Sequence, residues 1–266
     1  IKVSISHFDG TAYRGPFAEI KNTTPHVRIE ENEEFLLYQS GATKAVVDKR
    51  PDSWGIRFLD GDREMTNTGF RNMANILNNE TGRKYTVDAL AIDVDEYIYG
   101  LGERFTPFVK NGQVVDMWNE DGGTASEISY KNIPFYITNK GYGILLDNEG
   151  DASYEIASEK VERIQFSVEG ERLDYYVING HTPKGTIQKY AELTGKPALP
   201  PAWSFGLWLT TSFTTNYDEE TTSSFIQGMA DRDIPLHVFH FDCYWMEAYE
   251  WCNFTWDPAA FPDPEG

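Results

Sequence analysis

The amino-acid sequence predicts a mostly β protein, with an N-terminal β-sandwich followed by the first βαβ portion of a (β/α)8 TIM barrel. Two observations support this prediction. Short alternating apolar runs recur between turn residues up to about residue 179, which is typical of sandwiches. After residue 203 the pattern becomes strand, helix and strand, with the connection length that parallel strands need. One βαβ unit cannot bury both faces of its sheet, so we expect it to begin a longer α/β array.

Residues 1–179 are expected to form the sandwich domain. Glycine-containing turns such as Asn139-Lys140-Gly141 and Glu169-Gly170 separate the predicted strands. Residues 1–6 already alternate like a strand, so we expect the start of this domain to be missing. The clearest strand segments are residues 35–38, 44–47, 55–59, 135–138, 143–146, 164–168 and 173–177.

Residues 180–202 are expected to form a helical linker between two domains. Thr182 is a good N-cap, Pro183 suits the first helical position, and Gly195 suits the position after the last helical residue. Prolines then follow at positions 197, 200 and 201 and predict a stiff connection.

Residues 203–266 are expected to hold the first two strands of a truncated barrel. An apolar strand is predicted at 205–209, and a second strand begins at Leu236. Acidic residues 218–220 predict a helix N-terminus between the two strands. The residues Thr222, Phe225, Ile226 and Met229 then form one stripe at helical spacing.

Composition limits the function. The 266 residues include 23 Lys and Arg against 42 Asp and Glu, a formal charge of −19. Such a surface repels nucleic acid and anionic membranes, because both bind through Lys and Arg. The two cysteines, Cys243 and Cys252, make neither a disulfide framework nor a metal site, and the histidines show no ligand spacing. We expect a cytoplasmic protein that needs no metal and no cofactor.

The strand that begins at Leu236 ends on the candidate site, Asp242-Cys243-Tyr244. Strand ends on this side of a barrel carry the chemistry. Asp242 could accept hydrogen bonds from substrate hydroxyls, or it could cap a nearby backbone N–H, and position alone does not decide. The aromatic residues around it, among them Phe213 and Tyr244, suit the apolar faces of sugars, although most such rings belong to a core.

Several segments resemble glycoside hydrolase family 31, in the family's order and spacing and over essentially the whole chain. The resemblance looks closest to the bacterial α-xylosidases. The segments are Tyr99-Gly100-Leu101-Gly102-Glu103-Arg104-Phe105, Trp118-Asn119-Glu120-Asp121-Gly122-Gly123, Asn132-Ile133-Pro134-Phe135-Tyr136, Pro201-Ala202-Trp203-Ser204-Phe205-Gly206-Leu207-Trp208, Phe241-Asp242-Cys243-Tyr244-Trp245-Met246 and Phe261-Pro262-Asp263-Pro264.

The resemblance implies a galactose-mutarotase-like sandwich, a catalytic barrel and a retaining mechanism that uses two aspartates. Both aspartates would lie on later barrel strands, so no catalytic residue is expected in this chain. The positions that match are substrate-binding. Asp242 would bind hydroxyls of the sugar in the −1 subsite, Phe213 would lie near the positive subsite, and Asp121 would enter the site from a sandwich loop. Cys243 and Tyr244 resemble the xylosidase pair, whose bulk would fill the space of a C6 hydroxymethyl group.

The expected function is therefore part of an α-xylosidase that releases α-linked xylose from xyloglucan-type oligosaccharides. The fragment alone is expected to be inactive. The alternatives are an α-glucosidase of the same family and a non-catalytic carbohydrate-binding sandwich. Expected partners are the oligosaccharide and the remainder of the polypeptide, with no nucleic acid and no membrane. Homo-oligomer formation is left open.

Overall fold

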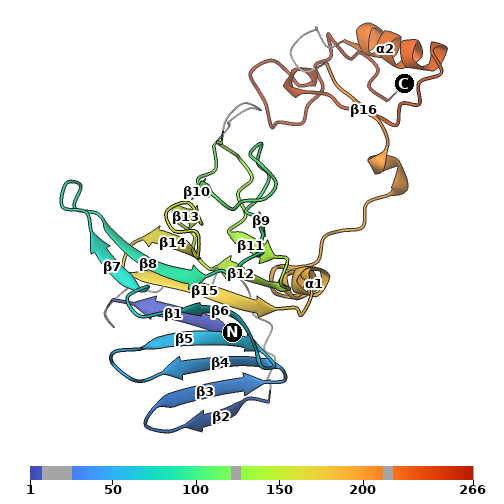
Figure 1. The fold of residues 1–266 in the computed structure, drawn as a ribbon. Coiled ribbons are helices and arrows are strands. Elements are labelled where there is room, and N and C mark those ends of the chain that lie inside the picture. Colours follow the sequence, from blue (N-terminus) through green and yellow to red (C-terminus); the bar gives the residue numbers. More distant parts are fainter. Residues whose placement is uncertain (8–25, 121–126, 212–217, 266) are drawn as a thin grey trace. The chain divides into compact units, whose positions relative to one another are not determined.

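The computed structural model describes residues 1–7, 26–120, 127–211 and 218–265. The chain divides into two compact units, Ile1–Lys196 and Pro197–Gly266. The first unit is built from antiparallel sheets (Figure 1). The second unit contains a parallel strand pair, as the sequence predicts. None of the helices in the described ranges is long and apolar enough to cross a membrane.

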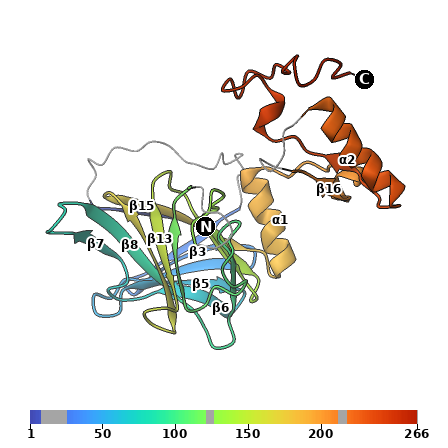
Figure 2. The same cartoon turned by 90° about the horizontal axis from the view of Figure 1, so that it is seen from above.

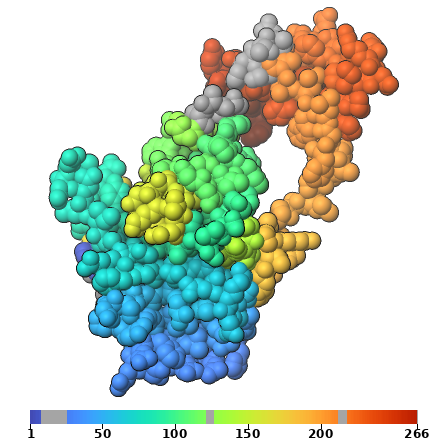
Figure 3. Space-filling model, in the orientation of Figure 1, coloured from blue at the N-terminus to red at the C-terminus, as the bar shows by residue number. Residues whose placement is uncertain are grey.

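Two five-stranded antiparallel sheets form the sandwich of the first unit. The first has the order β1-β15-β12-β11-β9, with bounds Lys2–Ser6, Arg172–Asn179, Tyr142–Leu146, Phe135–Thr138 and Ile98–Gly100. The second has the order β10-β13-β14-β8-β7, with bounds Gln113–Met117, Ala152–Ile156, Arg163–Glu169, Lys84–Ala91 and Ala74–Leu77. The hairpin of β7 and β8 stands out from the surface of this unit (Figure 3).

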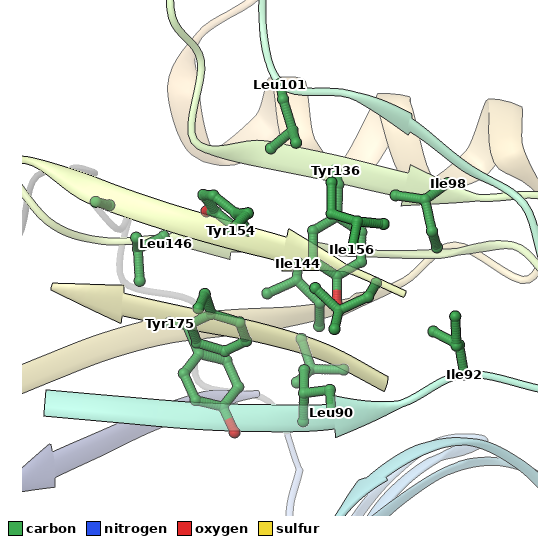
Figure 4. Packing of buried hydrophobic residues seen from close by; sticks show 14 of the residues in the cluster. Leu90, Ile92, Ile98, Leu101, Tyr136, Ile144, Leu146, Tyr154, Ile156 and Tyr175 are labelled. Atoms are coloured by element: carbon green, nitrogen blue, oxygen red, sulfur yellow. The ribbon is translucent and has the colours of Figure 1, made fainter. Parts of the chain in front are cut away.

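The main hydrophobic core lies between these two sheets (Figure 4). Alternation decides which side chains enter it, because successive residues of a strand point to opposite faces. Tyr136, Ile144 and Tyr175 face inward from the first sheet and are fully buried. Tyr154 and Phe166 come from the second sheet, and the edge of the Phe166 ring meets the Tyr175 ring at 5.2 Å. This core holds together strands that are far apart in sequence.

Helix α1, Pro183–Thr194, covers the opposite face of the first sheet (Figure 2). The outward residues Phe135, Leu145, Tyr176 and Ile178 pack there against Tyr190 and Leu193 of the helix. The rings of Phe135 and Tyr190 stack with centroids 4.1 Å apart. The first sheet is thus apolar on both faces, and the helix buries the second of them. The domain boundaries expected at residues 180 and 203 stay predictions.

The ends of α1 are formed as the sequence predicts. The side chain of Thr182 accepts a hydrogen bond from the N–H of Gly185 at 3.1 Å, and Pro183 opens the helix. Gly195 closes the helix with a φ of 103°, a conformation that other residues seldom adopt. Local sequence is therefore sufficient to define this helix.

A third sheet extends the first unit at one end. It is a meander in sequence order, with β2 at Arg28–Glu31, β3 at Phe35–Ser40, β4 at Thr43–Asp48, β5 at Gly55–Asp60 and β6 at Arg63–Thr68. Strand β6 packs on β8, where the Thr66 hydroxyl donates to the Ala91 carbonyl at 2.7 Å. Phe58 and Met65 of this sheet join the main core.

The second unit contains the expected βαβ segment in a shorter form. Strands β16, Trp208–Leu209, and β17, Val238–Phe239, pair in parallel, and helix α2, Glu219–Asp231, lies between them in sequence. The strand expected at 205–209 is reduced to its last two residues. A 3-10 helix, η1, occupies Ala202–Phe205 instead. Gly206 packs so closely on the His237 ring that a Cβ there would lie 2.2 Å from it.

Candidate functional site

The candidate site lies where the two parallel strands end. Leu209 pairs with Phe239, so the chain leaves β16 at Thr210 and leaves β17 at His240 on the same edge of the sheet. The backbone N–H of His240 donates to the Leu209 carbonyl at 2.8 Å and extends the pairing by one step. Parallel strands place their carboxyl ends together, and residues following β16 and β17 therefore meet at one edge.

Asp242 lies three residues after β17 and caps a short 3-10 helix, η2, at Cys243–Trp245. Its Oδ1 atom accepts a hydrogen bond from the Cys243 backbone N–H at 2.7 Å. The side chain is half-buried. The local capping contact considered at the sequence level is thus present. An ionised carboxylate has about four lone-pair positions, so this contact is compatible with hydrogen bonds from sugar hydroxyls.

Cys243 and Tyr244 follow on the first turn of η2. Burial raises the pKa of the Cys243 thiol, and a hydrogen bond to Asp242 and the charge of that carboxylate raise it further. The thiol is therefore neutral near pH 7, and a neutral thiol is a poor nucleophile. The Tyr244 ring is 44% exposed and packs edge-on against Trp251, with centroids 6.2 Å apart. Both side chains are thus suited to line a surface rather than to react.

An aromatic cluster supports the segment after β17. The Phe241 ring meets Trp256 and Phe261 edge-on at 5.6 and 5.5 Å, and Trp245 lies 4.7 Å from Trp256. Phe261 is buried. These rings serve as a small core, which is the interpretation that the sequence favoured for most aromatic residues here.

Two predicted site residues, Phe213 and Asp121, lie outside the described residues. The structure therefore brings together Asp242, Cys243 and Tyr244 and leaves the other two positions as predictions. The residues on both sides of Asp121 are described. They form two stems, residues 116–120 and 127–132, which emerge from the sandwich side by side: the Glu120 N–H donates to the Ser129 carbonyl at 3.1 Å.

Sequence reasoning missed Arg104, which binds both stems. Its Nη2 donates to the Asp116 carbonyl at 2.8 Å and its Nη1 donates to the Glu127 carbonyl at 3.0 Å. It also donates to Oδ1 of Asn132. The sequence contained one sign of this site, the glycine pair that precedes Arg104. Gly102 has a φ of 93°, and a Cβ there would lie 2.2 Å from the Lys131 carbonyl oxygen.

A carboxyl group with a strongly raised pKa lies inside the sandwich. Burial raises the pKa of Asp88 to about 6, although Thr68 and Tyr175 donate hydrogen bonds to it at 2.6 and 2.9 Å. These three residues belong to three different sheets, so Asp88 joins the sheets. In the part of the chain that the structure describes, no group of three or more His, Cys, Asp or Glu residues could hold a metal ion.

The chain thus contains a β-sandwich and, after it in sequence, a parallel strand pair with a carboxylate and aromatic rings beyond the strand ends, which is consistent with a carbohydrate-active enzyme. Two family models match. The "Glycosyl hydrolase 31 N-terminal galactose mutarotase-like domain" matches residues 8–155, and the "Glycosyl hydrolases family 31 TIM-barrel domain" matches residues 197–266. The chain belongs to glycosyl hydrolase family 31.

Two of the relatives named α-xylosidases match the whole chain. The chain is 53% identical to alpha-xylosidase XylQ of Lactiplantibacillus pentosus and 45% identical to an alpha-xylosidase of Emericella nidulans, with 100% of this chain covered in both comparisons. It covers 35% and 36% of those proteins, and so spans about a third of their length. A GH31 dextranase from Flavobacterium johnsoniae has the same fold, with a TM-score of 0.84 and 24% identity over 98% of this chain and 32% of its own.

Proposed function

We propose that the complete protein is an α-xylosidase that releases α-linked xylose from xyloglucan-type oligosaccharides. The observation that carries this proposal is the 53% identity to a protein named α-xylosidase, which extends over all 266 residues. A relative named alpha-glucosidase 2, from Bacillus thermoamyloliquefaciens, is only 28% identical over 99% of the chain. The higher identity to the α-xylosidase favours an α-xyloside over an α-glucoside as the substrate.

The proposed part of this chain in the reaction is to bind the sugar. Asp242 accepts hydrogen bonds from hydroxyls in the −1 subsite, and its capping contact holds the carboxylate in one orientation. Cys243 and Tyr244 line the wall of that subsite, and Phe213 lies near the positive subsite. Asp121 enters the substrate site from a sandwich loop. A retaining mechanism needs two carboxyl groups about 5–5.5 Å apart, and we assign both to barrel strands beyond this chain.

An α-glucosidase is the second candidate. Among the more distant relatives, proteins named α-glucosidase and proteins named α-xylosidase have similar sequence identities to this chain. One example is the pair of Saccharolobus solfataricus relatives named alpha-glucosidase and alpha-xylosidase, at 27% and 32% identity. The two sugars differ by one hydroxymethyl group, and one such group contributes only about 1–3 kcal/mol of discrimination. We therefore expect a preference for xyloside with measurable activity on glucoside.

The test is to purify the full-length protein and measure kcat/KM for matched aryl α-xyloside and α-glucoside. A higher value for the xyloside is expected. The 266-residue chain alone is expected to show no hydrolysis above a mock preparation. A higher value for the glucoside would replace the proposed substrate, and turnover by the 266-residue chain would show that the assignment of both aspartates to later strands is wrong.

We further propose that the protein acts in the cytoplasm and that its binding partner is a neutral oligosaccharide. Both Cys243 and Cys252 are free thiols, and the free state suits a reducing compartment. The formal charge of −19 disfavours polyanionic ligands. Fractionation of the source cells, followed by an immunoblot, would test the location.

A further inference from the structure

Trp256 contacts the chain on both sides of residues 242–244, which we call the binding turn. Its ring meets the Phe241 ring edge-on, with centroids 5.6 Å apart, and lies 4.7 Å from the Trp245 ring. Phe241 is the residue directly before the binding turn and Trp245 is the residue directly after it. One side chain from a later segment therefore packs against both ends of the turn that carries Asp242.

Backbone pairing holds Trp256 in this place. Met246 and Trp256 form an antiparallel bridge, and the Asp257 N–H donates to the Trp245 carbonyl at 3.0 Å. Met246 is buried. The chain that leaves the binding turn thus runs antiparallel to the segment that carries Trp256. Backbone contacts as well as ring contacts therefore place Trp256 beside the turn.

The same rings are fixed on their other side to helix α2. Phe261 is 4% exposed, and its ring lies 5.0 Å from the Trp256 ring and 5.5 Å from the Phe241 ring. The Ala260 carbonyl, directly before Phe261, accepts a hydrogen bond at 2.9 Å from the N–H of Glu219, the first residue of α2. The rings therefore connect the binding turn to a regular element of the second unit.

The loop that returns the chain to Trp256 contains unfavourable backbone conformations. Tyr249, Cys252 and Phe254 have φ values of 64°, 83° and 57°. Residues with a Cβ seldom adopt positive φ, and such conformations persist where the surrounding structure enforces them. The position of Trp256 beside the turn is therefore maintained against a local backbone cost, which a loop that only connects two segments would not require.

The capping bond of Asp242 does not by itself place the binding turn. The Cys243 N–H donates to Asp242 Oδ1 at 2.7 Å, and both groups belong to the turn. This bond orients the carboxylate relative to its own turn, whereas the contacts with Trp256 orient the turn relative to the rest of the unit. A sugar-binding group needs both, because its side chain and its backbone must be held in place together.

A plain core role is the alternative, since aromatic rings commonly bury apolar surface. Phe241, Trp245 and Trp256 are each half-buried. A plain core predicts that loss of the Trp256 ring lowers stability and leaves the kinetics unchanged. Because the contacts of this ring fall on the residues that adjoin the turn, we expect its loss to displace the turn as well. The two roles thus differ in a measurable way.

We propose that Trp256 is a positioning residue, which fixes the binding turn and thereby sets where the Asp242 carboxylate meets the sugar in the complete enzyme. The proposal rests on the proposed function, in which Asp242 binds sugar hydroxyls. Misplacement of a substrate-contacting group by about 1 Å can cost about a hundredfold in rate. Trp256 acts on the reaction through the turn and does not touch the reacting atoms.

The experiment is a double-mutant cycle in the full-length enzyme with Trp256→Leu, Asp242→Ala and the combined variant. Trp256→Leu is expected to lower kcat/KM for aryl α-xyloside about 10- to 100-fold. The combined variant is expected to lie within about threefold of Asp242→Ala, because Trp256 acts through the turn that carries Asp242. Trp256→Phe keeps a ring between Phe241 and Trp245, and its kcat/KM is expected to stay within about fivefold of wild type.

Phe166→Leu is the matched control, and the melting temperature of every variant is measured alongside. Phe166 is fully buried in the sandwich, where its ring lies 5.2 Å from the Tyr175 ring. Its replacement also removes an aromatic ring from a core, and so lowers the melting temperature. We expect it to change kcat/KM by less than about twofold. A plain core role predicts that Trp256→Leu behaves in the same way.

Two outcomes would overturn the proposal while the proposed function stands. Multiplicative losses in the combined variant would mean that Trp256 acts independently of Asp242. A Trp256→Leu enzyme with wild-type kinetics would mean that the ring positions nothing. If Trp256→Leu does not fold, Trp256→Met replaces it in the cycle, because a flexible methionine fills more of the space without restoring the ring.

Failure of the proposed function gives a different result. Unchanged kinetics in Asp242→Ala on both sugars would remove the binding role assigned to Asp242, and with it the group that Trp256 is said to position. A wild-type enzyme that hydrolyses only α-glucoside would contradict the xylosidase assignment alone. The same cycle run on the glucoside would then still test Trp256.

Discussion

The backbone N–H of Cys243 donates a 2.7 Å hydrogen bond to Oδ1 of Asp242, the residue immediately before it. This contact caps η2 and orients the Asp242 carboxylate at the end of the second parallel strand. A carboxylate held by its own turn needs no reorganisation to accept hydroxyl groups, and pre-orientation of this kind favours binding. The same turn sets the positions of Cys243 and Tyr244, so we expect binding and specificity to share one local structure.

Asp242→Ala is expected to lower kcat/KM of the full-length enzyme for both aryl α-xyloside and aryl α-glucoside, by about a hundredfold or more. Hydrogen bonds to a charged group contribute about 1.5–3 kcal/mol each, and the two sugars share the hydroxyls concerned. Asp242→Asn keeps an oxygen that can cap η2 but removes the negative charge. This variant therefore distinguishes a loss caused by a disrupted turn from a loss caused by weaker sugar binding. A loss restricted to one of the two substrates would contradict this role.

Replacement of Cys243 by Ile together with Tyr244 by Asp is expected to shift the preference of the full-length enzyme from α-xyloside towards α-glucoside. Removal of the ring makes room for a CH2OH group, and a carboxylate can accept its hydrogen bond. The gain in binding free energy for the glucoside is limited to about 1.5–3 kcal/mol, and the cost of desolvating the new Asp reduces it further. The measurement is the ratio of kcat/KM values for the two substrates. An unchanged ratio would show that the pair does not line the pocket.

Lys2→Met is expected to destabilise the 266-residue chain by about 3–5 kcal/mol, because it removes the cation beside the buried Asp147 and one of the two cations beside the buried Asp174. The Lys2 ammonium lies 2.9 Å from Asp147 and 3.1 Å from Asp174, whose side chains are 1% and 4% exposed. Urea unfolding measures the loss. Lys44→Met is the control, since its partner Asp62 is fully exposed and such pairs contribute about 0–1 kcal/mol. Equal losses in the two variants would contradict the prediction.

Asp88 is expected to make the stability of the sandwich fall as pH rises from about 4 to 6. Burial raises its pKa to about 6 in the folded chain, above the ordinary value of about 3.9. The folded state therefore holds a proton that the unfolded state has lost in this range, and stability falls with pH until the folded state has lost it too. Two pKa units correspond to about 3 kcal/mol, and this loss is nearly complete at about pH 7.

The Asp88→Asn variant measures this contribution of Asp88. Its amide oxygen can still accept from Thr68, and its NH2 group can donate to the Tyr175 hydroxyl. The difference in unfolding free energy between wild type and Asp88→Asn should change by about 3 kcal/mol between about pH 4 and pH 7, in favour of the variant at the higher pH. A difference that is constant with pH would show that Asp88 keeps an ordinary pKa.

Local patterns predicted many of the strands and the cap at Thr182, but they missed other strands. Strand β8 was missed although residues 84–89 alternate between polar and apolar, and its polar residues Thr86 and Asp88 are buried together with their apolar neighbours. Strand β2, which was also missed, has all four of its residues exposed. In the second unit, the close contact between Gly206 and His237, which are far apart in sequence, accompanies the shortening of the expected strand.

The sequence by itself determined the order of the main strands and helices, the cap at Thr182, the acidic helix start at residues 218–220, the family and the strand end that carries Asp242. Each of these depends on residues close together in the chain, whose spacing sets secondary structure directly. Only the tertiary structure decided that Arg104 connects the stems beside Asp121 and that Lys2 lies against Asp147. The register and packing of strands far apart in sequence determine which groups these side chains contact. A buried polar group must form a hydrogen bond, and only the folded structure decides which donor or acceptor lies within reach.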